Sequence, residues 1–212
     1  MVTELHTATS PASVLTVMAH PDDAELWAGG TLARLAQAGA AVTIAVPDHA
    51  DAIRNAEAAA GAGELGARYR QYATVDADSL HDVLDATRPE VVITHPLEDV
   101  HPEHRHVAST LTAALPEIVI ATGFPRRVYT SDTYNGLTDH GPVAAHSIID
   151  VTRTWNIKMR ALAAHTSQPI AEHFGPMAET LGRLWGNRIG TRYGENFTPL
   201  PILGRLPAAT TL

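Results

Sequence analysis

The sequence predicts an α/β protein of one domain, built on a mostly parallel β-sheet. Short apolar runs rich in β-branched residues alternate with longer segments whose apolar residues recur at helical spacing. This alternation is typical of strand–helix–strand units, whose strands lie parallel. No repeat, linker or change of composition interrupts the 212 residues, a length that suits one domain with a sizeable core.

Six runs are predicted as strands because each is short, apolar and bounded by turn residues. The first lies between Pro11 and Pro21. The predicted strands cover residues 14–18, 41–46, 90–94, 118–120, 128–130 and 147–149. With helices on both faces, such a sheet forms a Rossmann-like three-layer sandwich, which is the fold we expect.

Helices are predicted between and after these strands from apolar positions at helical spacing. They cover residues 24–39, 48–65, 79–86, 104–115, 150–162 and 173–184. The pair Gly29-Gly30 would cost a helix interior about 1 kcal/mol per glycine relative to alanine. The pair therefore indicates a delayed helix start or a close approach of another segment to the backbone. Lys158 is expected either on the exposed face of its helix or behind the site residues, where it would support them.

The two ends of the chain are predicted to lie outside the domain. Residues 1–12 are polar and read as a flexible N-terminal arm, residues 13–198 as the domain, and residues 199–212 as a C-terminal tail. Residues 185–197 combine glycines with aromatic side chains, a composition that suits a lid or an oligomer contact.

Composition excludes several classes of function. The formal net charge of −8 argues against an electrostatic grip on nucleic acid or on an anionic membrane. Without cysteine there is no disulfide and no thiolate, so any zinc ion must be held by His, Asp or Glu. No apolar stretch approaches the roughly 20 residues that span a bilayer, and the first residues do not resemble a signal peptide. We therefore expect a cytoplasmic protein.

Chemistry-bearing residues follow two of the predicted strands. His20, Asp22 and Asp23 come directly after strand 14–18, and the segment 101–104, His-Pro-Glu-His, follows strand 90–94. Open α/β sheets place their sites beyond the carboxyl ends of strands, so the two groups can converge on one ion. The alternative is that the two aspartates only cap the following helix.

Three segments resemble the signature of the PIG-L/LmbE-like zinc-dependent de-N-acetylases. Residues 20–23, followed by Glu25 and by Gly-Gly-Thr-Leu at 29–32, resemble the first motif. Residues 101–105 resemble the second motif, usually HPDHR, and residues 158–168 resemble a later K…AL…H-x-S-Q segment. Together they span most of the chain.

The resemblance implies a role for each matching residue. His20, Asp23 and His104 match three zinc ligands with water in the open position, although His and Asp ligands also accommodate another divalent ion. Asp22 matches the general base. His101 matches a histidine that stabilises an oxyanion or acts as an acid.

Two places depart from the family pattern or admit another interpretation. Glu103 replaces the aspartate of HPDHR, so either Glu103 or Asp99 is expected to orient His101. Arg54 matches a substrate-binding arginine of an R-x-x-E pair, but it also suits a surface helix charge paired with Asp51 or Glu57. The loop at 46–50 is shorter than in the family and lacks its acidic segment.

The resemblance implies an enzyme that removes an N-acetyl group from a small amino-sugar-containing or related metabolite, by attack of a zinc-bound water. Two alternatives remain: an amidase acting on a non-sugar or thiol-conjugate amide, and a metal-containing binding protein without catalysis. The implied partner is a small N-acyl substrate. A homo-oligomer is compatible with the resemblance, since relatives commonly form trimers or hexamers.

Overall fold

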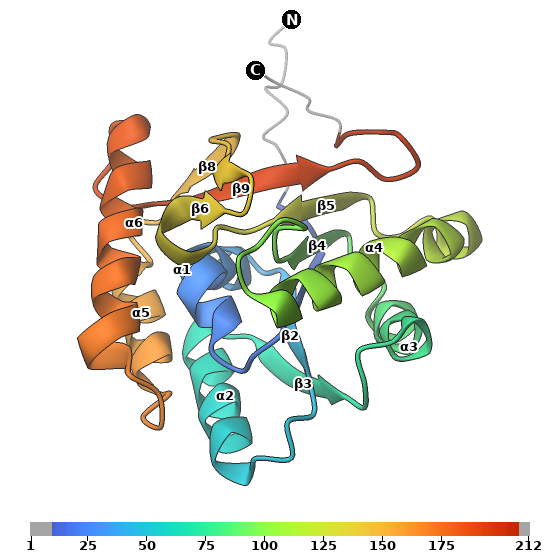
Figure 1. Cartoon of the computed structure of the whole chain (residues 1–212), viewed down its shortest axis with the longest axis horizontal. Coiled ribbons are helices and arrows are strands. Elements are labelled where there is room, and N and C mark those ends of the chain that lie inside the picture. The colour runs from blue at the N-terminus through green and yellow to red at the C-terminus, as the bar shows by residue number, and fades with distance from the viewer. Residues whose placement is uncertain (1–9, 208–212) are drawn as a thin grey trace, which may run out of the picture.

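A seven-stranded sheet with helices on both faces forms the frame of the protein (Figure 1). The structure is a computed structural model that describes residues 10–207, so most of the predicted arm and the end of the predicted tail lie outside the described residues. The strand order is β3-β2-β1-β4-β5-β9-β8. The five strands from β3 to β5 pair in parallel, whereas β9 runs antiparallel to both β5 and β8. The predicted α/β sandwich with a mostly parallel sheet is confirmed.

The main sheet consists of β1 (Ser13–Val17), β2 (Ala41–Pro47), β3 (Arg68–Tyr72), β4 (Val91–Thr94), β5 (Arg127–Thr130), β8 (Ser147–Asp150) and β9 (Gly194–Leu200). A separate hairpin is formed by β6 (Leu137–Thr138) and β7 (Gly141–Pro142). The helices are α1 (Asp23–Gln37), α2 (Ala52–Leu65), α3 (Ala77–Thr87), α4 (Pro102–Thr122), α5 (Trp155–Ala163) and α6 (Gly175–Arg188). A 3-10 turn at Tyr134–Gly136 and a π-helical turn at Ile170–Phe174 complete the described elements. Within residues 10–207, no helix combines the length and apolar character needed to cross a membrane.

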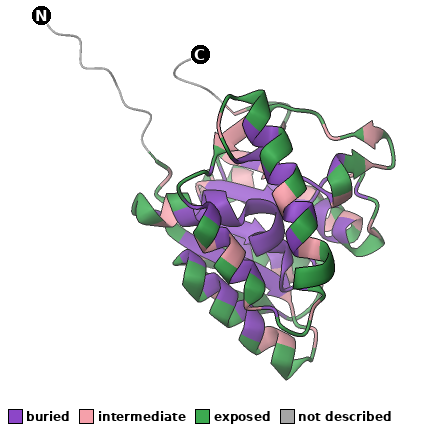
Figure 2. Ribbon diagram, turned by 90° about the vertical axis from the view of Figure 1, so that its left-hand side faces the viewer, coloured by how far each residue is buried: buried purple, intermediate pink, exposed green. Residues whose placement is uncertain are grey.

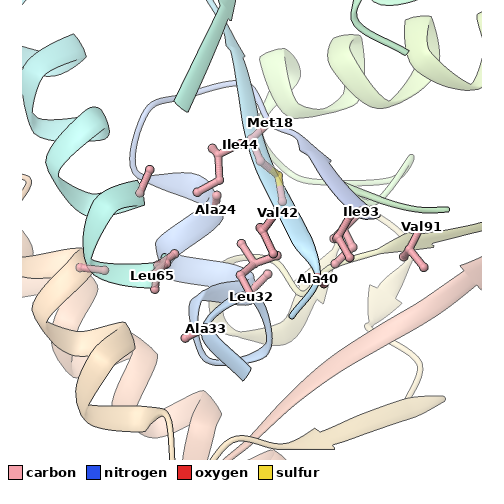
Figure 3. Packing of buried hydrophobic residues seen from close by; sticks show 14 of the residues in the cluster. Met18, Ala24, Leu32, Ala33, Ala40, Val42, Ile44, Leu65, Val91 and Ile93 are labelled. Atoms are coloured by element: carbon pink, nitrogen blue, oxygen red, sulfur yellow. The ribbon is translucent and has the colours of Figure 1, made fainter. Parts of the chain in front are cut away.

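The core lies on both faces of the sheet. On one face, α1 and α2 cover strands β1, β2 and β4, where Leu32 and Leu65 meet Val42 and Ile44 (Figure 3). On the other face, α3 and α4 cover the same strands. Helices α5 and α6 pack outside α1, at the left-hand edge of Figure 1. The central sheet is accordingly the most buried part of the chain, and the outer helix faces are exposed (Figure 2).

A buried ion pair lies against the backbone of α1, beside its two glycines. Lys158 Nζ contacts Glu195 Oε1 at 2.6 Å, and Glu195 accepts hydrogen bonds from the backbone N–H groups of Gly30 and Thr31. A Cβ atom at Gly29 would lie 3.1 Å from Lys158 Cγ. The glycine pair therefore marks a close approach, while α1 itself begins earlier, at Asp23. Of the two places expected for Lys158, the exposed face is wrong, because the side chain is buried and its amine is neutralised by a buried carboxylate.

Two predicted elements differ in the structure because tertiary contacts override local signals. Residues 118–120 continue α4 instead of forming a strand, although Pro116 lies inside the helix. Ile118 extends the buried stripe of Leu111 and Leu115, whereas Ile120 is 74% exposed, which is the spacing of a helix. Residues 185–197 hold the end of α6, a short turn at 189–193 and the start of β9 inside the sheet, so they do not form a lid.

Element boundaries and the strands β3, β6, β7 and β9 also escaped the sequence analysis. Strand β3 is polar and lies at the edge of the sheet, so it lacks the apolar run on which the prediction rested. Helix α3 is capped by Asp76, whose side chain accepts the N–H of Ser79. Helix α5 begins at Trp155, with four residues between it and the end of β8 at Asp150. Strand β9 runs to Leu200, across the predicted domain boundary at 198.

Gly30 provides a test of the packing of α1. A Cβ atom there would lie 2.6 Å from Cβ of the buried Val151, so we expect Gly30→Ala to lower the free energy of unfolding by about 2 kcal/mol or more. The matched control is Gly63→Ala in α2, where nothing lies within 4 Å and alanine should raise stability by about 0.5–1 kcal/mol. Urea denaturation of both variants measures the difference. Equal stability of the two would contradict the close approach at Gly30.

Candidate metal centre and active site

Three predicted ligands meet at the carboxyl ends of the central strands. Strands β1 and β4 pair in parallel, so the segments that follow them lie side by side. His20 Nδ1 lies 3.2 Å from His104 Nε2 and 3.2 Å from Asp23 Oδ2. His104 Nε2 lies 3.4 Å from Asp23 Oδ1. The structure thus brings together side chains separated by more than 80 positions in the sequence.

The spacing and chemistry of these atoms fit a divalent cation. A tetrahedral zinc ion with bonds of 2.0–2.1 Å separates its ligand atoms by about 3.3–3.4 Å. Two imidazole nitrogens and a carboxylate oxygen are a typical ligand set of catalytic zinc sites, which keep one position open. Burial disfavours the charged form of Asp23, but His104 and His95 hold its pKa well below its usual range. The carboxylate is therefore ready to bind a cation at neutral pH.

The backbone after β1 holds His20 and Asp23 in place. Pro21 biases His20 away from helical geometry, and α1 begins at Asp23. Asp23 Oδ2 accepts the backbone N–H of His20 at 2.8 Å, and Asp23 Oδ1 accepts the indole N–H of Trp27 at 3.2 Å. Burial lowers the pKa of His20, but the carboxylates of Asp23 and Glu103 outweigh it and raise the pKa to about 9. An incoming cation therefore has to displace a proton from this ring.

Asp22 lies beside the ligand cluster and contacts Arg54. Asp22 occupies the N-cap position of α1, but its side chain makes no capping hydrogen bond there. The interpretation of Asp22 as only a helix cap is therefore wrong. Arg54 extends from the first turn of α2, and one of its guanidinium nitrogens lies 3.1 Å from Asp22 Oδ1. Burial and the charge of Asp23 raise the pKa of Asp22, while His165 and Arg54 act in the opposite direction. Among the described residues the guanidinium thus pairs with Asp22 and forms no ion pair with Asp51 or Glu57.

The later motif at 165–168 supports the same corner of the site. Glu57 accepts hydrogen bonds from Thr166 Oγ1 at 2.7 Å, from Ser167 N–H at 2.8 Å and from Ser167 Oγ at 2.6 Å. These contacts tie the helix of Arg54 to the end of α5. Beneath them, His165 and Glu25 are fully buried, 3.7 Å apart, against Gly61.

His101 lies at the mouth of the site, half-buried, as the N-cap of α4. Its Nδ1 accepts the backbone N–H of Glu103 at 3.3 Å. The ring lies 4.9 Å from the His20 ring, edge to face, and 4.6 Å from the His104 ring. Burial and the neighbouring histidines lower the pKa of His101, which keeps the ring neutral. A neutral ring whose Nδ1 accepts a hydrogen bond carries its proton on Nε2.

The expectation that Glu103 or Asp99 orients the His101 ring is not met. Among the described residues, neither carboxylate lies within 4 Å of that ring's nitrogens. Asp99 accepts the backbone N–H of His101 at 2.8 Å, and its Oδ2 lies 3.1 Å from His104 Nδ1, although the two atoms are not aligned as a hydrogen bond. Glu103 Oε2 lies 2.5 Å from His20 Nε2. Each carboxylate contacts a predicted ligand histidine instead.

Three further aromatic residues lie in the site, and two of them, His49 and Tyr134, were missed from the sequence. His95 is fully buried and stacks on His104 at 3.8 Å, with its Nε2 accepting the N–H of Ala19 at 2.9 Å. His49 lies on the short β2–α2 loop, stacked 5.7 Å from His20. Tyr134 stacks 5.8 Å from His104. All three follow carboxyl ends of parallel strands, so the rule that located His20 would also have located them.

Known proteins resemble both the sequence and the fold. Residues 15–115 match the model of the PIG-L family, described as GlcNAc-PI de-N-acetylase. A 1D-myo-inositol 2-acetamido-2-deoxy-alpha-D-glucopyranoside deacetylase from Actinosynnema mirum is 28% identical over 237 positions, covering 76% of this chain and 82% of that protein. A diacetylchitobiose deacetylase from Thermococcus kodakarensis is 26% identical over 227 positions, covering 89% and 83%.

One solved structure shows that the fold alone does not decide the reaction. The 4-carboxy-2-hydroxymuconate hydratase from Pseudomonas putida KT2440 superposes with a TM-score of 0.76 at 20% identity, covering 94% of this chain and 98% of that one. A likeness at this identity concerns the fold alone, so the reaction has to be argued from the site. The resemblance to the PIG-L family rests on the sequence match over residues 15–115 and on the two deacetylase relatives. The chain thus resembles the PIG-L family over residues 15–115, just under half of its length, and it resembles two deacetylases over most of its length.

Proposed function

We propose that this protein is a zinc-dependent hydrolase that removes an N-acetyl group from a small amino-sugar-containing metabolite. The observation that carries the proposal is the cluster of His20, Asp23 and His104, whose facing atoms lie 3.2–3.4 Å apart, with Asp22 beside them. Those three side chains would hold the ion. When bound, zinc acts as a Lewis acid toward an amide carbonyl and lowers the pKa of water.

The side chains around the cluster supply the proton transfers of amide hydrolysis. Asp22 accepts a proton from the attacking water and later delivers it to the leaving amine as the C–N bond breaks. The products are acetate and a free amine. Arg54 fixes the Asp22 carboxylate at 3.1 Å and presents its remaining N–H groups to the substrate. His101, with its proton on Nε2, donates a hydrogen bond to the oxygen that gains charge in the transition state.

The substrate class follows from the two relatives, since both act on compounds that contain an N-acetylated amino sugar. A small N-acyl compound is therefore the proposed partner, and a membrane or nucleic-acid partner is not. We expect acetate release from at least one compound of a panel of N-acetylated amino sugars and none from matched non-sugar acetamides. Release of acetate only from the non-sugar acetamides would show that the substrate is a non-sugar amide. Release from none of the compounds would contradict the proposal.

Asp22 provides the test of the general base. We expect Asp22→Asn to lower kcat by about 10²–10⁴-fold, because the amide cannot accept the proton of the attacking water. Zinc content should stay at the wild-type level, since Asp22 is not one of the three ligands. The control is Asp82→Asn, the same change at an exposed position of α3, which should leave kcat unchanged. Full turnover by Asp22→Asn would remove Asp22 from this role.

His104 provides the test of the metal site. We expect His104→Ala to lose at least nine-tenths of the bound zinc, because two remaining ligands hold the ion weakly. Elemental analysis of the purified protein measures this directly. The control is His106→Ala, an exposed histidine on the same helix, which should retain the metal. Wild-type zinc content in His104→Ala would show that the ion binds elsewhere.

A further inference from the structure

Glu103 makes a contact that the mechanism above does not use. Its carboxylate oxygen Oε2 lies 2.5 Å from Nε2 of His20, while Nδ1 of the same ring faces Asp23 and His104 at 3.2 Å. The imidazole is therefore held at both nitrogens. The Glu103 side chain is 65% exposed, and His20 is its one ion-pair partner among residues 10–207.

The contact determines which nitrogen of His20 is free to bind a cation. A carboxylate only accepts hydrogen bonds, so the nitrogen that faces Glu103 carries the proton. In the neutral ring the lone pair then lies on Nδ1, the nitrogen directed at Asp23 and His104. Hydrogen bonds of this kind to the far nitrogen of a ligand histidine fix its tautomer and its orientation.

The start of α4 holds Glu103 where it can reach His20. His101 caps the helix and accepts the backbone N–H of Glu103, while Pro102 occupies the first helical position. A carboxylate in the first turn also interacts favourably with the helix dipole. Aspartate is shorter by one carbon–carbon bond, about 1.5 Å. An aspartate on this backbone would therefore not reach His20 at hydrogen-bond distance.

His104 also has a carboxylate beside the ring nitrogen that faces away from the ligand cluster. Asp99 Oδ2 lies 3.1 Å from His104 Nδ1, and both side chains are fully buried. Each of the two histidines thus has one carboxylate at the nitrogen that faces away from the cluster. Asp99 lies just before α4 and Glu103 lies in its first turn. The exposed position of Glu103 is also the one at which the chain departs from the HPDHR pattern.

We propose that Glu103 is a positioning residue that holds the Nε2 proton of His20 and thereby directs Nδ1 at the metal. This inference rests on the proposed function, since it requires the ion to lie between His20, Asp23 and His104. Glu103 itself touches neither the ion nor the substrate in this role. Its length, and not only its charge, is what the role needs.

Two substitutions separate length from charge. Glu103→Asp keeps the charge and loses the reach, whereas Glu103→Gln keeps the reach and an accepting oxygen but loses the charge. We expect Glu103→Asp to weaken zinc binding by about 10–100-fold and Glu103→Gln to weaken it less. Competition with a chromophoric chelator measures the zinc dissociation constant of each variant. Glu117→Gln, an exposed change on the same helix, is the matched control and should bind zinc as the wild type does.

Proton NMR of the zinc-loaded protein provides a second readout, independent of turnover. The Nε2–H signal of His20 should lie far downfield in the wild type and in Glu103→Gln, and should be lost to solvent exchange in Glu103→Asp. Wild-type zinc affinity in Glu103→Asp would overturn the inference. If His104→Ala retains the metal, the proposed site fails. If His104→Ala loses it while Glu103→Asp matches the wild type, only the role of Glu103 fails.

Discussion

The parallel pairing of β1 with β4 is the constraint on which the site depends. Its register, Val14 opposite Val91 through Thr16 opposite Ile93, sets the two strand ends at the same height. From one end the chain turns into the segment with His20, and from the other into α4 with His104. A shift of register by one residue would also turn every side chain of β1 to the opposite face, so the buried core enforces the alignment.

Support for the ligands comes from several elements at once. Trp27 donates to Asp23, Asp99 lies behind His104, and the Glu57 contacts bring α2 and its arginine against α5. The charges buried in this region are paired or hydrogen-bonded in large part, which limits the free energy that their desolvation costs. Such a supporting shell is what holds a catalytic group within a fraction of an ångström of its working position.

The sequence predicted the fold class well, because the fold class rests on strong local signals. The resemblance also pointed to three side chains, those of His20, Asp23 and His104, that the structure brings together. Apolar β-branched runs marked the interior strands, and polar residues at two strand ends marked the site. Strand β3 escaped because an edge strand needs no apolar run, and residues 118–120 looked like a strand because Pro116 resembles a helix stop. The partners of Glu103 and Lys158 depend on which segments meet in space. Residue spacing along the chain does not predict those meetings.

The contact between Glu195 and the middle of α1 bears on the order in which the molecule is made. Glu195 bonds to Gly30, 165 positions earlier in the chain, and comes from the last strand of the sheet. During synthesis on the ribosome, the helix that begins with Asp23 emerges long before this anchor exists. Until β9 inserts between β5 and β8, Lys158 has no counter-ion in its pocket. The packing of Lys158 against α1 therefore awaits the last strand of the sheet, and a chain that ended before β9 would leave this buried amine without its carboxylate.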